Sequence, residues 1–155
     1  MHDESEPEST SGGLRLMREI VAGRRPMPSM AETVPIRFTL AGPGRIEGEA
    51  RADERHLNPM GGVHGGFAAT VLDSVTGCAV HTTLEEGDLY ATIDLGVKML
   101  RAVPRDTWVR ATGEILHRSR TLGVAEGRLL DPGGRLLAHA TATCQVRQAT
   151  LRTAS

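Results

Sequence analysis

The stretch NPMGGVHGGFAATVLDSVTGCAVH, residues Asn58–His81, decides how this chain folds. It opens with a glycine-rich turn, after which apolar residues occupy nearly every side of a potential helix. A helix that is apolar all round is a buried helix. We therefore predict one long buried helix directly after the turn, with the rest of the chain packed around it.

One face of this predicted helix is small and polar. At about 100° per residue, four positions share that face and His81 lies at its margin: Gly66, Thr70, Asp73 and Gly77. The Asp73 carboxylate would lie in apolar surroundings, where desolvation of a charge costs free energy. The preceding glycines allow close approach of a ligand, and the first amides of a helix are unpaired and partially positive. An oxygen with developing negative charge could be held there.

The pattern Asn58-x5-His64-Gly65-Gly66-x6-Asp73 resembles the signature of hotdog-fold acyl-CoA thioesterases of the phenylacetate-degradation (PaaI-like) type. The resemblance implies an α+β hotdog fold, in which an antiparallel sheet of five to six strands wraps round one long helix. It also implies hydrolysis of an aryl- or medium-chain acyl-CoA to free acid and coenzyme A. No cofactor is expected, because coenzyme A is part of the substrate.

The resemblance assigns roles within the motif. In similar thioesterases the acid at the position of Asp73 activates water or attacks the thioester carbonyl itself. The Gly65 amide would donate to the thioester oxygen, and Gly66 would leave room for that approach. Asn58 would help to bind the carbonyl or thiolate side of the substrate. Each has a purely structural alternative: a buried hydrogen-bond acceptor, a tight glycine turn and an ordinary Asn-Pro turn.

Two further residues are candidates for the catalytic centre. His64 could protonate the leaving thiolate, position the substrate or simply complete the turn. Because the thiol of coenzyme A is a good leaving group, we favour positioning. Similar thioesterases hold the attacking water with a Ser or Thr near Thr92, for which a surface threonine in a strand is the alternative.

The phosphates of coenzyme A call for arginine, lysine or backbone amides. The segment His117–Thr121 reads as a basic, hydroxyl-bearing hairpin turn, and similar proteins bind the nucleotide near such a turn. Arg118, Arg120 and Thr121 are therefore candidate substrate-binding residues, with Arg101 as another possibility. A charged turn that is only solvated is the alternative.

The spacing within the motif predicts an assembly. Asp73 lies more than two helical turns, about 12 Å along the axis, from Gly65, so the two cannot easily meet at one carbonyl within a subunit. We predict an obligate homodimer with shared sites that pairs further into a homotetramer.

The rest of the chain is organised around the long helix. Residues 1–13 are predicted to be a disordered tail, and residues 14–150 a single domain. Apolar spacing predicts a short helix over 14–22, and the apolar segment Pro26–Met30 either packs over the core or lines an acyl pocket with Met27 and Met30. Alternation predicts strands over 34–40, 46–52, 91–99, 107–117, 122–130 and 136–146.

Two strands carry explicit predictions about their faces. The first should turn one apolar set inward: Val34, Ile36, Phe38 and Leu40. The third should do so with Ala91, Ile93, Leu95, Val97 and Met99, which leaves Thr92 on the opposite face.

Composition excludes several classes of function. A net charge of -1 and 3% aromatic residues disfavour nucleic-acid binding. No segment approaches the roughly 20 apolar residues of a membrane span, and the two isolated cysteines, Cys78 and Cys144, suit a reducing cytoplasm. The spacing of His56, His64 and His81 matches no metal motif. We expect a cytoplasmic protein without metal, nucleic-acid or membrane partners.

Two rival functions stay open. Hydratases or dehydratases of the same fold use an Asp-x4-His pair, but the fifth residue after Asp73 is Cys78 and the next histidine is His81. A non-catalytic acyl-CoA sensor would bind in the same pocket without cleavage. No DNA-binding helix pair or basic face accompanies the motif, which disfavours a regulator.

Overall fold

The computed structural model describes residues 10–149 of the chain. Its elements follow the predicted order of a short helix, two strands, a long helix and four strands. Their bounds are α1 Gly12–Val21, α2 Met30–Thr33, β1 Ile36–Gly42, β2 Arg45–Arg51, a 3-10 turn Glu54–His56, α3 Gly65–His81, β3 Leu89–Met99, β4 Trp108–Arg118, β5 Leu122–Leu130 and β6 Leu136–Arg147.

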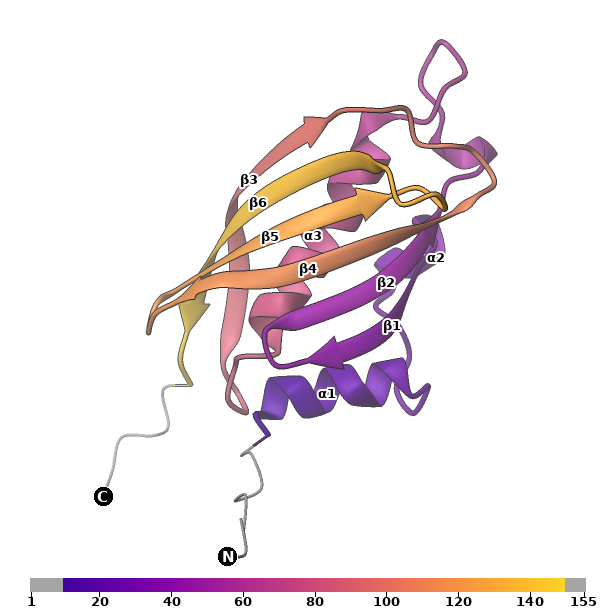
Figure 1. Ribbon diagram of the computed structural model, residues 1–155. Coiled ribbons are helices and arrows are strands. Elements are labelled where there is room, and N and C mark those ends of the chain that lie inside the picture. The colour runs from indigo at the N-terminus through magenta and orange to yellow at the C-terminus, as the bar shows by residue number, and fades with distance from the viewer. Residues whose placement is uncertain (1–9, 150–155) are drawn as a thin grey trace, which may run out of the picture.

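The strands form a six-stranded antiparallel sheet in the order β1-β2-β4-β5-β6-β3. The sheet curves around α3, and α1 lies beside β1 at one end (Figure 1). This arrangement confirms the predicted α+β hotdog architecture. Because β3 pairs only with β6, one of its edges is left without a strand partner among the described residues.

The long helix fits within the sheet because small residues line the inner face of the sheet. A Cβ atom added to Gly113 would lie 2.1 Å from the carbonyl oxygen of Val75 on α3, so only glycine allows this approach. The buried positions of β6 continue the small surface with Ala138, Ala140 and Ala142. Val75 is 1% exposed, as expected for a helix enclosed by a sheet.

Two β-bulges reverse predicted strand faces. The bulge between Phe38 and Leu40 leaves Leu40 41% exposed, so its predicted inward position is wrong. The bulge between Thr92 and Asp94 leaves Ile93 59% exposed, and Ala91 is also exposed. An extra residue in one strand shifts the side-chain alternation by one. The first half of β3 therefore turns Tyr90 and Thr92 toward α3 instead.

The N-terminal part differs in detail from its predictions. Most of the predicted tail lies outside the described residues, but α1 begins at Gly12, where the Ser11 hydroxyl accepts from the Leu14 amide. The predicted extended segment at 26–30 leads into α2. The predicted domain end at residue 150 lies outside the described residues. Within residues 10–149, no helix is long and apolar enough to cross a bilayer.

Candidate active site

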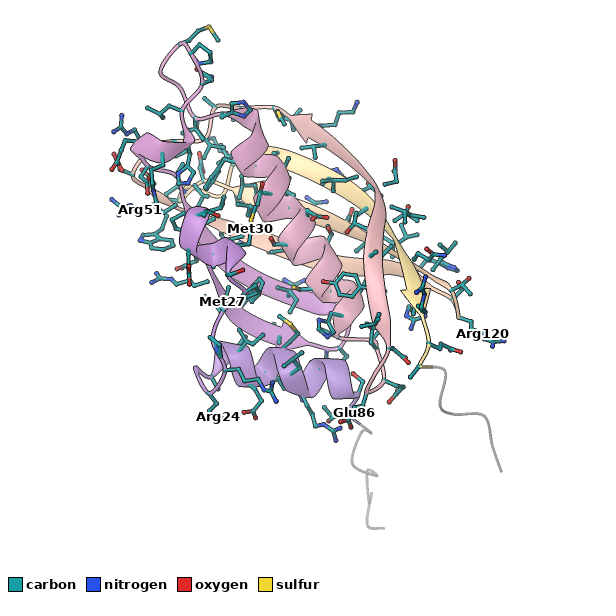
Figure 2. The ribbon with its side chains drawn as sticks, turned by 180° about the vertical axis from the view of Figure 1, so that it is seen from behind. Arg24, Met27, Met30, Arg51, Glu86 and Arg120 are labelled. Carbon is teal, nitrogen blue, oxygen red and sulfur yellow. The ribbon has the colours of Figure 1, made fainter. Side chains whose placement is uncertain are left out.

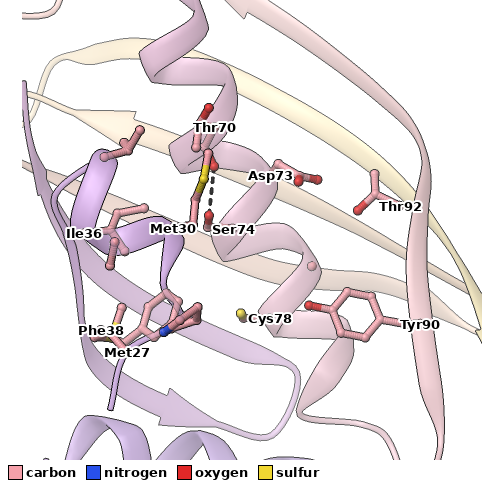
Figure 3. A pocket seen from close by; sticks show the side chains of 14 residues that line it. Met27, Met30, Ile36, Phe38, Thr70, Asp73, Ser74, Cys78, Tyr90 and Thr92 are labelled. Carbon is pink, nitrogen blue, oxygen red and sulfur yellow. Dashed lines mark hydrogen bonds between the residues drawn. The ribbon is translucent and has the colours of Figure 1, made fainter. Parts of the chain in front are cut away.

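A cavity of ≈ 260 Å³ opens along the polar face of α3, and we call it the first cavity. It lies between α3, the start of β3 and the segment that leads from α1 into β1 (Figure 3). Its lining residues are Met27, Pro28, Met30, Ala31, Val34, Ile36, Phe38, Thr70, Asp73, Ser74, Gly77, Cys78, Tyr90 and Thr92. The predicted polar stripe of the helix thus forms one wall of an otherwise largely apolar hollow.

Asp73 is the only one of these residues with a buried side-chain oxygen that lacks a hydrogen bond within residues 10–149. The neighbouring hydroxyls do not donate to Asp73, because Thr70 donates to the Gly66 carbonyl and Ser74 donates to the Thr70 carbonyl. A buried polar atom without a partner costs about 1–3 kcal/mol. A structural acceptor would have found a donor, so this carboxylate is instead free to bond a molecule in the cavity.

Thr92 faces Asp73 across the first cavity (Figure 3). It is half-buried, and its hydroxyl lies 3.7 Å from the Cys144 sulfur, which is its one hydrogen-bond partner in the described chain. The bulge after Thr92 is what turns it inward. Bulges recur next to active sites because they re-aim side chains. The arrangement allows a water molecule between the carboxylate and the hydroxyl.

Met27 and Met30 both line the first cavity, which supports a role beyond simple packing over the core. Figure 2 shows them beside the segment that leads into β1, on the side of the long helix opposite β3. Methionine side chains adapt to varied shapes, which suits the wall of a binding pocket.

Cys78 and Tyr90 are pocket residues that the sequence did not reveal. Cys78 belongs to the apolar residues of the predicted helix, and Tyr90 lies just before the predicted strand 91–99, so the sequence assigned a pocket role to neither. Burial raises the pKa of the Cys78 thiol to about 12, and burial also raises the pKa of the Tyr90 hydroxyl. A thiol with such a pKa stays protonated at neutral pH and is a poor nucleophile.

A second cavity, of ≈ 320 Å³, lies at the N-terminal end of α3. His64 and Gly65 line it together with Val63, Ala68, Met99, Leu100, Arg101, Ala102, Val103 and Ala138. His64 is the N-cap of α3, where its Nδ1 accepts from the Gly66 amide at 2.8 Å. The Gly65 amide has no acceptor among the described residues, so it is available to an oxygen in this cavity.

His64 is fixed by its capping bond. Because Nδ1 accepts a hydrogen bond, a neutral ring carries its proton on Nε2. A Cβ atom on Gly66 would lie 2.9 Å from this Nδ1, so Gly66 is needed for the cap itself. The capping bond occupies Nδ1 and leaves Nε2 without a partner in the described chain, so the positioning role of His64 stays a prediction.

Asn58 organises the loop in front of the helix. Its Oδ1 accepts from the amides of Met60 and Gly62, at 2.9 and 3.2 Å. Its Nδ2 donates to no acceptor within residues 10–149 and can therefore serve a ligand. Gly61 has a φ of 86°, which explains the need for glycine at that point of the turn.

The basic hairpin turn lies away from both cavities. Arg118 donates to the Thr83 hydroxyl, just beyond the C-terminal end of α3, and Arg120 donates to Gln148. Arg120 marks this end of the sheet in Figure 2. Thr121 is exposed in the same turn, whereas Arg101 lines the second cavity beside Gly65.

The structure thus separates two half-sites along one helix. Asp73 and Thr92 line the first cavity, and His64 and Gly65 line the second, about 12 Å away along the helix axis. No group of three His, Cys, Asp or Glu side chains in the described chain is arranged to hold a metal ion. His56, for example, is occupied by the Thr33 carbonyl and the Asp53 amide.

Comparisons with known proteins identify the family and the fold. The family model of the thioesterase superfamily matches residues 60–138. Acyl-coenzyme A thioesterase 13 of Homo sapiens is 27% identical over 104 residues, which cover 66% of this chain and 74% of the relative.

Solved structures extend the likeness. A phenylacetic acid degradation-related protein of Ralstonia eutropha JMP134 has a TM-score of 0.75 at 32% identity, and the match covers 83% of this chain and 97% of that one. A thioesterase of Streptococcus pneumoniae TIGR4, solved with coenzyme A, has a TM-score of 0.68 at 24% identity and shows the shared fold; the match covers 74% of this chain and 87% of that one. Since the family model spans more than half of the sequence, the chain belongs to the thioesterase superfamily and is a thioester hydrolase of the hotdog fold.

Proposed function

We propose that this chain hydrolyses acyl-CoA thioesters, with an aryl or medium-chain acyl group, within the PaaI-like subgroup. The relative in Homo sapiens is named as an acyl-coenzyme A thioesterase, and the Streptococcus pneumoniae relative was solved with coenzyme A. The largely apolar first cavity suits an acyl group, and the carboxylate in its wall suits attack on the adjoining carbonyl.

In the proposed reaction, Asp73 removes a proton from water, or attacks the carbonyl carbon directly and is released by water. The Gly65 amide and the Asn58 side-chain amide bond the carbonyl oxygen as negative charge develops on it. Thr92 holds the water and His64 orients the substrate. The C–S bond breaks, coenzyme A leaves as the thiolate and takes up a proton, and the carboxylic acid is released. No cofactor takes part.

One observation carries this proposal. The Asp73 carboxylate has a buried oxygen without any hydrogen-bond partner in the described chain, although it lies in the wall of a cavity. A protein retains such an arrangement at a cost in stability when a substrate or water supplies the missing bonds.

The separation of the two half-sites supports an assembly with a second copy of the chain. The free edge of β3 exposes Leu89, Ile93 and Met99, which are 65%, 59% and 55% exposed. An unpaired edge of this length is a template for another strand. We propose that two copies associate so that Asp73 of one protomer and Gly65 of its partner share one thioester, and that two such dimers form a homotetramer.

A hydrolysis assay tests the proposed activity. The wild-type protein should release free thiol from a panel of aryl- and straight-chain acyl-CoAs, detected with a thiol-reactive dye, and Asp73→Asn should abolish the release. Tight binding of the esters without thiol release would instead support a sensor and overturn the proposal.

A subunit-mixing experiment tests the shared site. Asp73→Asn and Asn58→Ala homodimers should each be inactive, because every site contains one lesion. After subunit exchange, half of the dimers are hybrids, and each hybrid has one intact site, so about a quarter of the wild-type activity should return. Sites contained within one protomer would give no recovery, and an active monomer on gel filtration would also refute the sharing.

Two possible positions for the coenzyme A phosphates can be separated by single variants. Arg101 lines the second cavity and has no carboxylate partner in the described residues, so Arg101→Ala should raise KM. Arg118→Ala and Arg120→Ala should raise KM if the nucleotide instead reaches the hairpin turn with Thr121. We place the enzyme in the cytoplasm, because both of its cysteines are unpaired thiols.

A further inference from the structure

The first cavity has a polar part and an apolar part, arranged along α3. Asp73 and Thr92 mark the polar part, and the lining continues along the helix through Gly77 to Cys78. Five residues separate Asp73 from Cys78, which is about 7.5 Å along the helix axis. Tyr90 comes from β3 beside Cys78, and its hydroxyl points toward the cavity (Figure 3).

The Tyr90 ring packs against α3 at Gly77 and His81. A Cβ atom on Gly77 would lie 3.1 Å from its Cε2 and 3.2 Å from its hydroxyl oxygen, so the helix touches the ring edge. The His81 ring packs against it with 5.4 Å between centroids, at an interplanar angle of 51°. An aromatic side chain packed in this way forms a rigid surface.

Behind this surface lies more empty space. His81 also lines an open cavity of ≈ 610 Å³ beside α1 and the loop that follows α3. The Tyr90 ring lines the first cavity, and the His81 ring that packs against it lines this larger hollow. Removal of the Tyr90 ring would lengthen the first cavity as far as the His81 ring.

The size of the first cavity decides what it can hold. A cavity of about 150 Å³ accommodates one benzene molecule. The ≈ 260 Å³ of the first cavity is therefore enough for a group of that size with a few more atoms, but not for a long alkyl chain. With the thioester carbonyl beside Asp73, a chain that extends along the helix would meet Tyr90.

We propose that Tyr90 is a specificity-determining residue, whose ring closes the acyl end of the first cavity and limits the length of the acyl group. This inference rests on the proposed acyl-CoA hydrolysis. It assigns the limit to the ring itself and not to the hydroxyl.

The test is a series of straight-chain acyl-CoAs from butanoyl to palmitoyl, with kcat/KM measured for each. Tyr90→Ala should raise kcat/KM for the long esters relative to the short ones by at least about tenfold, the discrimination that small changes in an apolar pocket provide. Tyr90→Phe keeps the ring and should keep the wild-type profile. Leu116→Ala is the matched control, because Leu116 is an exposed apolar residue of β4 outside the first cavity, and its chain-length profile should equal that of the wild-type protein.

The possible outcomes separate the role of Tyr90 from the proposed hydrolysis. An unchanged chain-length profile in Tyr90→Ala, with hydrolysis intact, would overturn the role of Tyr90 and leave the proposed function standing. Failure of the wild-type protein to cleave any ester would overturn the proposed function itself. Should Tyr90→Ala fail to fold, Tyr90→Leu replaces it, and Gly77→Ala, which adds a methyl group to the cavity wall in contact with the ring, should shift the profile toward shorter esters. An unaltered profile in both would again reject the inference.

Discussion

Replacement of Asp73 by asparagine should remove activity and yet stabilise the fold. The substitution keeps the shape of the side chain and removes the negative charge from the wall of the first cavity. Without a carboxylate, the protein loses its base or nucleophile. Without a buried, unpartnered charged oxygen, it also loses an unfavourable contribution to its free energy of folding.

The two expected effects differ in sign and in size. A lost general base lowers kcat/KM by about 10²–10⁴-fold. An unsatisfied buried polar atom costs about 1–3 kcal/mol, and asparagine still leaves a neutral amide oxygen there, so the gain should be on the order of 1 kcal/mol. For a domain of this size that corresponds to a rise in Tm of about 2–4 °C.

The assay combines thiol release with thermal unfolding of the same samples. Asp106→Asn is the matched control, because Asp106 is exposed, asparagine tolerates its φ of 55°, and its ion pairs with Arg51 and Arg105 lie at the surface. That control should change activity little and unfolding free energy by less than about 1 kcal/mol. A marked fall in Tm for Asp73→Asn would contradict the assignment of an unpartnered buried oxygen, since it would show that the carboxylate is bonded within the fold.

The cap of α3, the contact at Gly113 and the buried His81 give further predictions. His64→Ala should lose the N-cap of α3 and with it about 0.5–2 kcal/mol of stability. His64→Asn keeps a capping side chain, so it should restore the melting temperature but not kcat. Full recovery of kcat in His64→Asn would show that the imidazole has no part in the reaction. Gly113→Ala should destabilise the protein by about 1–3 kcal/mol or more, measured by denaturant unfolding, because its methyl group would meet the Val75 carbonyl; a neutral effect would mean that α3 can move outward. Burial lowers the pKa of His81 below its unfolded value, so the unfolded chain binds more protons and stability should fall as pH drops below about 6.5 through the folded pKa. His81→Phe should reduce that acid-side loss in melts across this range, and an unchanged pH profile would exclude His81 as its source.

The Asn58–His81 stretch was sufficient to predict the central helix, because an apolar periodicity without a polar face has only one stable location, the interior. The same pattern identified Asp73, since a carboxylate on the small face of a buried helix is conspicuous in sequence. Regular alternation over 136–146 predicted a strand, and in β6 the alternate residues Ala138, Ala140, Ala142, Cys144 and Val146 are all buried, with Leu136 half-buried. Regular alternation is reliable where no bulge interrupts the strand.

The limits of sequence reasoning appear at β1 and β3. A bulge adds one residue to a strand and reverses every face beyond it, yet neither Leu40 nor Ile93 differs in type from a core residue. Thr92 was given the outward face of its strand for this reason although it lines the cavity, and Tyr90 was missed because it lies just before the predicted strand. The role of Met27 and Met30 also depended on where the segment before β1 would cross the helix.

The buried helix, the sheet around it and the acid on the small face were predictable from the amino-acid pattern, because they follow from local periodicity and from the need to bury apolar surface. The residues that share a cavity with that acid, the absence of a partner for its buried oxygen within residues 10–149, and the separate cavity at the helix N-terminus became visible in the folded chain. Those facts depend on strand register and on contacts between distant segments, and a single extra residue in a strand is enough to change them.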